Sequence, residues 1–319
     1  MGAFGRNHAR VYHQLAQQGA PVRLVGVVDS NLARADAVAK EFGCRAFGSI
    51  EQLTTTHSEV RAASAAVPTV AHLETARILM AAGIDVLIEK PLAPSLSEAD
   101  ELIQLARRFD RVVQVGHLER FNPAVRATIP IVTQPMFFEV HRLSVFTPRA
   151  LDVDVVLDLM IHDLDIVLAL VNSPIKEIRA VGLPILSAKT DIANVRIEFE
   201  SGCVANFTAS RVSTERVRKL RFFQPRQYIS VDYGRQDVLV FTVDGEDRAP
   251  GIPSINPQIK VSKPPVTTEE PLYAELKAFL ESVRTVSQPA VSLEEGRRAL
   301  AVALEIAESI ASHGRKLQI

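Results

Sequence analysis

An acid and a histidine stand four residues apart in one of the most apolar stretches of the chain. The segment VVLDLMIHDLDIV (155–167) contains Asp158 and His162, which share one face if the segment is helical, with Asp165 one turn further on. A buried acid that orients an imidazole suits proton transfer. A satisfied polar pair in a core is an alternative interpretation. A metal site of His162, Asp163 and Asp165 is disfavoured, because no second histidine or cysteine stands at helical spacing, and we expect no metal.

A lysine is the second candidate for chemistry. Lys90 directly follows IDVLIE (84–89), an apolar run of strand length that ends in Glu89. In open α/β sheets, ligands bind at the carboxyl ends of the strands. Burying an ammonium group without a partner is unfavourable, so a core position for this lysine is disfavoured. An ion pair between Lys90 and Glu89 at the rim is the alternative, and Pro91 allows a cis peptide bond after the lysine.

The first ten residues, MGAFGRNHAR, match the second part of a nucleotide-binding turn, and an ordinary turn or helix start with two glycines is the alternative interpretation. Gly2 and Gly5 have the spacing of the second and third glycines of G-x-G-x-x-G, which lies between a strand and a helix. The first glycine and its strand would precede Met1. Loss of that central strand would leave backbone groups of its neighbours unpaired. We therefore expect either that the native protein begins upstream of Met1, or that this chain is a truncated and defective form.

An acid follows the next strand. The run VRLVGVV (22–28) ends at Asp29, placed where a carboxylate would accept hydrogen bonds from the adenosine ribose hydroxyls of a dinucleotide. The same carboxylate would repel a 2′-phosphate, so this position favours NAD over NADP. Asp29 could also cap the helix that begins near Asn31, and the two roles are compatible.

Short apolar runs alternate with helical stretches through the first 120 residues. The strand-like runs cover residues 22–28, 62–67, 84–89 and 111–116. This alternation indicates βαβ units and a parallel sheet. We predict an N-terminally truncated Rossmann domain over residues 1–120.

The pattern changes after residue 120. A long strand (136–146) and a long buried helix (153–171) precede several strands, with a hairpin signal at Ser201-Gly202. A Pro-rich stretch, 250–271, is expected to be a loop, and two helices close the chain. We predict an α+β domain over residues 121–319 with a mostly antiparallel sheet. Its last helix could pack back on the first domain. The whole is an α/β protein.

Composition limits the class of partner. The 36 basic and 37 acidic residues give a formal net charge of −1, which argues against nucleic acid and anionic membranes as partners. No apolar run approaches the roughly 18–20 residues needed to span a bilayer. Cys44 and Cys203 are too few for a disulfide framework. We expect a soluble, cytoplasmic protein with a small-molecule substrate.

Taken together, these motifs resemble the Gfo/Idh/MocA oxidoreductase family over essentially the whole chain. The segments that carry the resemblance are GAFG, Asp29, AVPTVAH (66–72), EKP (89–91), GHLERFNP (116–123) and DLMIH (158–162). The resemblance implies a Rossmann domain that binds NAD, an open-sheet second domain, and homodimers or homotetramers formed through that sheet. The chain departs from the family pattern in lacking the first glycine and the first strand.

The resemblance also implies roles for residues. Lys90 would lie near the nicotinamide and the reacting hydroxyl, His162 would take the hydroxyl proton, and Asp158 would orient or relay. Alcohol oxidation needs a base at oxygen and a hydride acceptor facing the carbon. The implied cofactor contacts are Gly2, Phe4, Gly5, Asp29, Pro68, Thr69, His72, Glu89 and Lys90.

Within the family, GHLERFNPAV (116–125) and the segment from His141 to Ile166 look most like the branch that acts on nucleotide-linked amino sugars. The reaction expected from that likeness is oxidation of the 3-hydroxyl of UDP-N-acetylglucosamine, in lipid A assembly. Arginine suits a diphosphate, although surface ion pairs would also explain the arginines. An inositol, simple sugar or sugar acid as substrate stays open, as does a non-catalytic ligand-binding relative. The candidate substrate contacts are His117, Arg120, Asn122 and Arg149.

Overall fold

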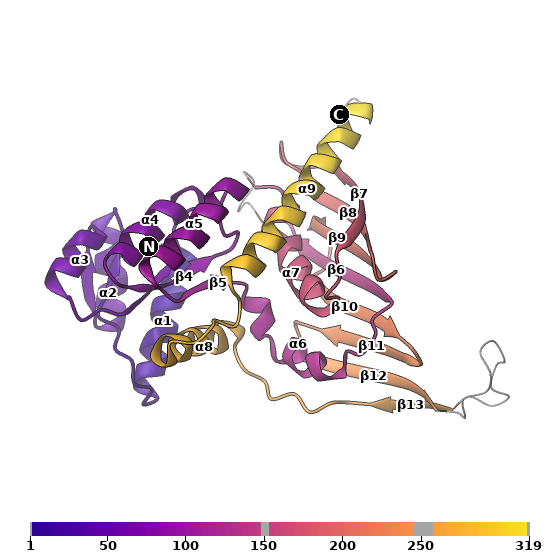
Figure 1. The fold of residues 1–319 in the computed structure, drawn as a ribbon, viewed down its shortest axis with the longest axis horizontal. Helices are drawn as coiled ribbons and strands as arrows, with labels where there is room; N and C mark the ends of the chain where they lie inside the picture. Colours follow the sequence, from indigo (N-terminus) through magenta and orange to yellow (C-terminus); the bar gives the residue numbers. More distant parts are fainter. Residues whose placement is uncertain (1, 148–152, 245–257, 318–319) are drawn as a thin grey trace. The chain divides into compact units, whose positions relative to one another are not determined.

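The computed structural model describes residues 2–147, 153–244 and 258–317 (Figure 1). The chain forms two compact units. The first contains Met1–Leu118 and Glu270–Leu300, and the second contains Glu119–Glu269 and Ala301–Ile319. The domain ranges 1–120 and 121–319 stay a prediction. Among the described residues, no helix combines the length and apolar character that crossing a bilayer would require.

The first unit contains five short parallel strands. They are β1 (Gly26–Val28), β2 (Arg45–Phe47), β3 (Ala62–Ala65), β4 (Asp85–Glu89) and β5 (Val113–Gly116). β1 pairs with β2, and β3, β4 and β5 form a second sheet in that order, with every pairing parallel. The predicted parallel arrangement is confirmed. β2 was not predicted from the sequence, because it is only three residues long and begins with the exposed Arg45.

Helices alternate with these strands. They are α1 (Ala3–Gln17), α2 (Leu32–Phe42), α3 (Ile50–Thr56), α4 (His72–Ala81), preceded by the 3-10 turn η1 (Thr69–Ala71), and α5 (Leu96–Phe109). Local signals fix their ends: the side chain of Asn31 caps α2, Gly43 ends it in the left-handed region at φ 66°, and Ser95 caps α5. The helix ends in turn set where each following strand begins.

The two parallel sheets of the first unit are separate. In a doubly wound fold of strand order 3-2-1-4-5-6, β2 and β1 take the places of strands 3 and 2, and β3 to β5 take those of strands 4 to 6. The break between β1 and β3 therefore falls at the place of strand 1 in that order.

Residues after 269 complete the core of the first unit. Helix α8 (Pro271–Thr285) contributes Leu276 and Phe279 to a buried cluster with Val11, Leu15 and Leu87. Helix α9 (Leu293–Leu317) begins in this unit. The backbone of Gly296 lies so close to Val115 that an added Cβ would stand 2.7 Å from Val115 Cγ2.

The second unit contains an eight-stranded sheet. Its strands are β6 (Phe137–Val145), β7 (Ile175–Leu183), β8 (Ile192–Phe199), β9 (Val204–Ser213), β10 (Val217–Gln224), β11 (Gln227–Asp232), β12 (Asp237–Asp244) and β13 (Gln258–Ser262). Their order is β13-β12-β11-β10-β6-β9-β8-β7, and β6 and β9 run parallel while the other neighbours are antiparallel. The predicted open, mostly antiparallel sheet is confirmed.

Two local predictions in this unit have different outcomes. The hairpin at Ser201-Gly202 is confirmed, with Gly202 at φ 83° between β8 and β9. The expected loop over 250–271 is wrong for Gln258–Ser262, which pairs with β12 as an edge strand, and residues 250–257 lie outside the described residues. Gln258–Ser262 alternates polar and apolar residues as a strand does, and all five residues are exposed, as expected at the edge of a sheet.

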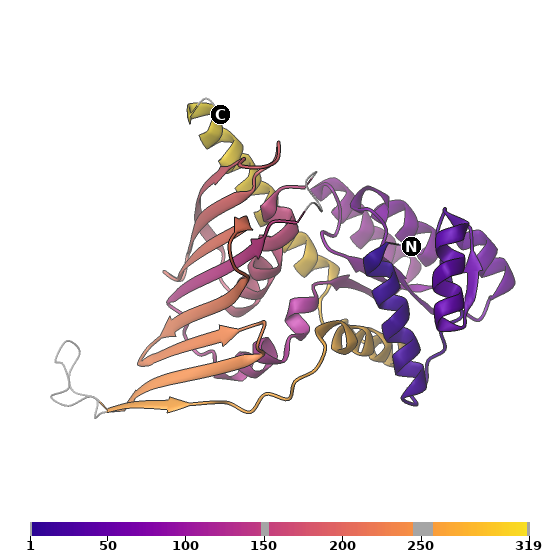
Figure 2. The same ribbon diagram turned by 180° about the vertical axis from the view of Figure 1, so that it is seen from behind.

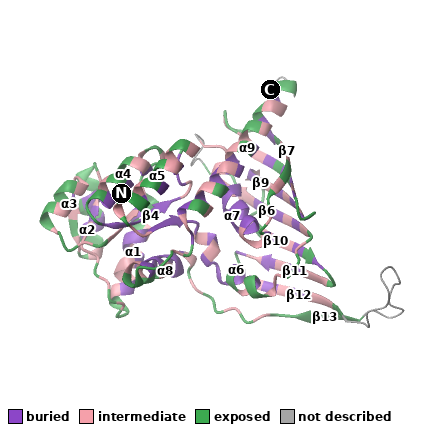
Figure 3. Cartoon of the chain, in the orientation of Figure 1, coloured by how far each residue is buried: buried purple, intermediate pink, exposed green. Residues whose placement is uncertain are grey.

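One face of this sheet is covered and the other is not. Helices α6 (Pro123–Thr128) and α7 (Ile161–Leu170) and the later part of α9 lie on the same side of the sheet in both views (Figures 1 and 2). The short turns η2 (Leu118–Phe121) and η3 (Ile129–Ile131) flank α6. Side chains of the covered face are fully buried, such as Phe138, Phe207 and Phe222, and α7 is buried along most of its length (Figure 3). We call the opposite side, on which no described helix lies, the open face.

Candidate active site

The first group of candidate residues lies at the carboxyl end of β4. Glu89 is the last residue of that strand and is buried, and Lys90 follows it, half-buried. The Lys90–Pro91 peptide bond is cis. Glu89 Oε2 accepts a hydrogen bond from the backbone N–H of Lys90 at 3.3 Å.

The carboxylate of Glu89 is enclosed on two further sides. His8, in α1, places Nε2 2.9 Å from Glu89 Oε1, and both side chains are buried. On the neighbouring strand β5, an added Cβ at Gly116 would stand 2.9 Å from Cδ and Oε1 of Glu89. Glu89 therefore fills space that is open because residue 116 is glycine.

The N-terminus of α1 fits a dinucleotide phosphate. Gly2 occupies the N-cap position without a side-chain cap, the first turn contains no acid, and nothing lies within 4 Å of the Cβ position of Gly2. The uncapped N–H groups and the helix dipole favour an anion here. Phe4 is 40% exposed and Gly5 is buried.

Asp29 lies immediately after β1. Its Oδ1 accepts a hydrogen bond from the N–H of Asn31 at 2.7 Å, while Asn31 itself caps α2. Asp29 therefore supports the start of α2 from outside the cap position. The half-buried carboxylate stands at the carboxyl end of its strand, as an acceptor for ribose hydroxyls would.

Three predicted cofactor contacts follow β3. Pro68 is exposed and Thr69 is half-buried. His72 is buried, with Nδ1 3.2 Å from the carbonyl oxygen of Leu92 and Nε2 3.1 Å from that of Val67. Burial lowers the pKa of His72, although these carbonyls favour its protonated form. The ring thus joins the segments that follow β3 and β4.

His117 lies at the end of β5. It directly follows Gly116, is 1% exposed, and donates its backbone N–H to the carbonyl oxygen of Val115 at 2.8 Å. The structure therefore brings Lys90, Glu89 and His117 to the same edge of the sheet, because Glu89 and Gly116 are partners in the β4–β5 pairing.

The second group of candidates lies in the second unit, on the covered side of the sheet. The predicted helix over 153–171 is a π-helical turn, η4 (Val156–Met160), followed by α7. Asp158 lies half-buried in the π turn, and His162 lies in the first turn of α7, 8% exposed. π turns are frequent at functional sites. Asp154 Oδ1 accepts from the N–H groups of Val156 and Leu157 and fixes the beginning of the turn.

Two acids that follow His162, Asp163 and Asp165, form bidentate ion pairs with arginines. Arg142 on β6 donates from Nε and Nη2 to Asp163, at 2.6 and 2.9 Å. Arg120 in η2 donates from Nε and Nη2 to Asp165, at 2.7 and 3.0 Å. Among the described residues there is no group of three or more His, Cys, Asp and Glu side chains arranged to hold a metal ion.

Arg142 also joins Asp163 to the segment after β5. Its Nη1 donates to Glu119 at 2.9 Å, and its guanidinium lies 5.4 Å from the ring centroid of Tyr233. Burial opposes the charge on Arg142, but Asp163 and Glu119 outweigh it and raise the pKa of the guanidinium. Burial raises the pKa of Asp163, and Arg142 offsets this only in part.

Both the nitrogen and the oxygen of the Asn122 side-chain amide form hydrogen bonds within the protein. Nδ2 lies 3.2 Å from Glu119 Oε2 and 3.1 Å from the carbonyl oxygen of Tyr233, and Oδ1 accepts from the N–H of Ala124 to cap α6. The side chain is 2% exposed. Arg149 lies outside the described residues.

Comparisons with known proteins agree with this arrangement. A model of an oxidoreductase family with an NAD-binding Rossmann fold matches residues 1–117, and one of the GFO/IDH/MocA C-terminal domain matches residues 132–230. UDP-N-acetylglucosamine 3-dehydrogenase of Acidithiobacillus ferrooxidans is 37% identical over 308 residues, covering 96% of this chain and 94% of that one. The chain belongs to the Gfo/Idh/MocA oxidoreductase family.

Solved structures of the family superpose on nearly the whole chain. UDP-N-acetylglucosamine 3-dehydrogenase GnnA from A. ferrooxidans has a TM-score of 0.87 at 35% identity, covering 98% of this chain and 95% of that one. Levoglucosan dehydrogenase, in complex with NADH and levoglucosan, has a TM-score of 0.82 at 18% identity with the same coverage, a likeness of fold alone. As a Gfo/Idh/MocA protein, the chain is an NAD-dependent oxidoreductase.

Two residues of this family member escaped the sequence analysis although the sequence contains a signal for each. Arg142 stands in the strand pattern FFEVHRL, at an alternate position shared with the buried Phe138 and Val140, where an arginine needs a buried acid. His8 follows Gly5 by three residues on α1. Its partner Glu89 is 81 residues away, so no local pattern pairs them.

A buried acid directly before β8, Asp191, is linked through Arg211 to the chain near the π turn. Asp191 Oδ2 accepts the N–H groups of Ile185, Leu186 and Ser187 at 2.6–2.8 Å. Asp191 also pairs with Arg211, which donates to the carbonyl oxygen of Val153 near the start of the turn. Burial opposes ionisation, but hydrogen bonds from the Leu186, Ser187 and Ile185 N–H groups and the Ser187 hydroxyl outweigh it and lower the pKa of Asp191 to about 2.

Asp191→Asn is expected to destabilise the protein at pH 7 by about 2–3 kcal/mol, which corresponds to lowering a carboxyl pKa from about 4 to about 2. Because the folded-state pKa is depressed, this stabilisation is complete above pH 4 and is lost as the pH falls toward 2. The difference in Tm between the native protein and the Asp191→Asn variant should therefore shrink between pH 7 and pH 3. Glu215→Gln, in an exposed turn, is the control. A pH-independent difference would contradict the assignment.

Proposed function

We propose that this protein oxidises the 3-hydroxyl of UDP-N-acetylglucosamine to a ketone with NAD. The observation that carries the proposal is the 37% identity, over almost the full length of both chains, to the enzyme named for that reaction. The same branch supports a place in lipid A assembly, where a 3-keto sugar is a substrate for transamination. A cytoplasmic location belongs to the proposal and is supported by two free cysteines, Cys44 and Cys203.

In the proposed mechanism, His162 accepts the proton of the substrate hydroxyl. Asp158 orients the imidazole or relays its proton, and Lys90 contacts the reacting oxygen and stabilises negative charge that develops on it. Bound NAD would supply the acceptor for the hydride that leaves the carbinol carbon. Burial of His162 in α7 limits the ways in which its ring can turn.

Cofactor binding is proposed for the residues at the strand ends of the first unit. The N-terminus of α1 at Gly2, with Phe4 and Gly5, would hold the pyrophosphate, and Asp29 would hold the adenosine ribose. Pro68 and Thr69, exposed and half-buried, would line the nicotinamide half. His72 and Glu89 are buried and would act by shaping that surface.

Two of the predicted substrate contacts already have hydrogen-bond partners within the protein. Asn122 and Arg120 are held by protein partners, so we propose that they fix the segment that follows β5 and contribute to the substrate site through that segment. His117 begins that segment. Arg149 is proposed for the diphosphate from the sequence alone.

The test is steady-state formation of NADH with UDP-N-acetylglucosamine, N-acetylglucosamine, myo-inositol and a sugar acid. We expect turnover with the nucleotide sugar and a primary isotope effect from deuterium at C3 but not at C4. Preference for a free sugar or inositol would replace the proposed substrate. NADH binding without turnover on any of the four would favour a ligand-binding role.

We also propose that the protein is a homodimer or homotetramer formed through the open face. An aromatic ladder crosses four strands there: the ring centroids of Phe137 and Phe223, of Phe223 and Tyr228, and of Tyr228 and Phe241 are 5.7, 4.9 and 5.2 Å apart. Phe223 is 38% exposed, and the edge strand adds Ile259 and Val261, 68% and 56% exposed. Contiguous apolar surface of this kind marks an interaction site.

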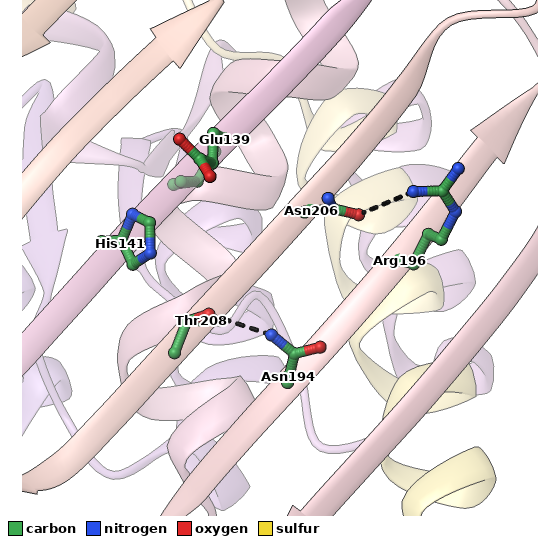
Figure 4. A pocket seen from close by; sticks show the side chains of 7 residues that line it. Glu139, His141, Asn194, Arg196, Asn206 and Thr208 are labelled. Carbon is green, nitrogen blue, oxygen red and sulfur yellow. Dashed lines mark hydrogen bonds between the residues drawn. The ribbon is translucent and has the colours of Figure 1, made fainter.

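A polar pocket of about 270 Å³ lies on the open face, next to the aromatic ladder. Figure 4 shows the side chains that line it. Hydrogen bonds from Asn194 Nδ2 to Thr208 Oγ1 and from Arg196 Nη1 to Asn206 Oδ1 order its floor. A mixture of apolar core and hydrogen-bonding rim is typical of homomeric interfaces. The lining residues come from three neighbouring strands: Glu139, Val140, His141, Asn194, Arg196, Asn206 and Thr208.

Phe223→Asp is expected to dissociate the oligomer, because a carboxylate would replace a ring in the ladder. Sedimentation equilibrium should give a multiple of 35.0 kDa for the native chain and a lower mass for the variant. Val286→Asp, at an 81% exposed residue of the first unit, should leave the mass unchanged. A native chain that sediments as a monomer would disprove this interface.

A further inference from the structure

We infer that His8 is a positioning residue for Lys90, acting through the buried carboxylate of Glu89, and that Gly116 is required to admit that carboxylate. The inference rests on the proposed role of Lys90 in the reaction. It concerns three residues from three different elements, α1, β4 and β5, within one compact unit.

The contact of His8 with Glu89 is short, buried and directional. Nε2 lies 2.9 Å from Oε1, and the side chains are 3% and 8% exposed. An ionised carboxylate can only accept, so Nε2 donates. A charge-assisted hydrogen bond in a dry environment holds its partners more tightly than a neutral one. One oxygen of Glu89 is therefore fixed by α1.

The other oxygen of Glu89 faces the lysine backbone. Oε2 accepts from Lys90 N–H at 3.3 Å, so the carboxylate bridges α1 and the first peptide after β4. Without His8, the carboxylate would lose its buried donor and would turn away from its present position. That change would alter the support at the point where the Lys90 side chain leaves the backbone.

Gly116 lies against the third side of the same carboxylate and leaves room for it. A methyl group there would stand 2.9 Å from Cδ and Oε1 of Glu89 and 3.1 Å from its Cα. Because Glu89 and Gly116 are register partners, β5 cannot move away without breaking the pairing. Any side chain at residue 116 would displace Glu89, which makes the glycine a requirement of the site.

The test compares His8→Leu and His8→Gln with the native enzyme. His8→Leu should lower kcat by about 10- to 100-fold, the cost of a small misplacement of a reacting group, with KM for UDP-N-acetylglucosamine and affinity for NADH little changed. His8→Gln keeps an N–H donor near the position of Nε2 and should recover most of kcat. Gly116→Ala should lower kcat as His8→Leu does.

Two matched controls separate positioning from general damage. His13→Leu changes a half-buried histidine on the same helix, and Gly48→Ala adds a methyl group at ordinary contact distance from Gln52, 3.4 Å. Both should retain native kcat. If His8→Leu and His8→Gln lower Tm by the same amount and have the same kcat, His8 has only a structural role. That result would overturn the inference.

The proposed function and this inference fail in different ways. A native protein that binds NADH but turns over no sugar would remove the proposed function, whatever His8 does. A native enzyme that is active, with His8→Leu and Gly116→Ala equally active, would leave the function intact and disprove the positioning role. Loss of kcat in the His8→Leu variant, its recovery in His8→Gln and its loss in Gly116→Ala would establish that role.

Discussion

His162→Asn is expected to reduce kcat by roughly a thousandfold, within the range that general acid–base catalysis contributes. Asparagine keeps a polar side chain of similar reach but cannot take up the hydroxyl proton. Affinity for NADH should stay within a few-fold of native, because the cofactor contacts are proposed for the first unit and His162 belongs to the second. KM should change less than kcat, since the loss concerns the transition state.

The measurement is steady-state kinetics together with an NADH titration. The chain contains no tryptophan, so fluorescence of the cofactor can be followed against a low protein background. His313→Asn, at a half-buried histidine of α9 in the same unit, is the control and should be fully active. Lys90→Met should lose kcat to a similar degree, and the double variant should lose little more, because residues that act in one step are not additive.

Two results would contradict these roles. Native kcat in His162→Asn would remove the histidine from proton transfer and return the Asp158–His162 segment to a core role. A large loss of NADH affinity in the same variant, with kcat preserved, would make His162 a cofactor contact.

The order of elements could be predicted because its signals are local. Alternating apolar runs and helical spacings predicted the parallel strands and the antiparallel sheet, and residues typical of helix caps, such as Ser95 and Gly43, stand at helix ends. Candidate chemistry was found in the same way, from side chains such as Lys90 that stand at the end of an apolar strand. These features depend on neighbours in the sequence.

What could not be predicted depends on partners far apart in the chain. The ion pair of Arg142 with Asp163 joins residues 21 apart, and the His8–Glu89 contact joins residues 81 apart. The segment from Asp158 to His162 is a π turn followed by an α-helix and not the single helix that the sequence predicted. Arg211 on β9, which pairs with Asp191, donates to the carbonyl oxygen of Val153 just before that turn. Strand β13 was missed because its five alternating residues, QIKVS, stand within a Pro-rich stretch that indicates a loop.

Arg142→Met is expected to destabilise the protein by about 3–5 kcal/mol at pH 7, which is the usual effect of removing one partner from a buried ion pair. Methionine fills much of the volume, so the loss would come from charge and hydrogen bonding. Asp163 would lose both of the guanidinium donors described above, and Glu119 would lose one. Arg179→Met, at an exposed ion pair with Glu177, should cost less than about 1 kcal/mol and is the control.

The pH dependence of stability tests whether the carboxylates left without Arg142 destabilise the Arg142→Met variant. In the Arg142→Met variant, burial would hold the folded-state pKa values of Asp163 and Glu119 above their unfolded values, so the folded state would bind more protons. Its stability should then be greatest at low pH and fall as the pH rises through these carboxyl pKa values. The deficit in Tm against native protein should therefore narrow from pH 8 to pH 5. A deficit that is constant over this range would point to lost packing around Tyr233 instead, since the guanidinium stacks on that ring.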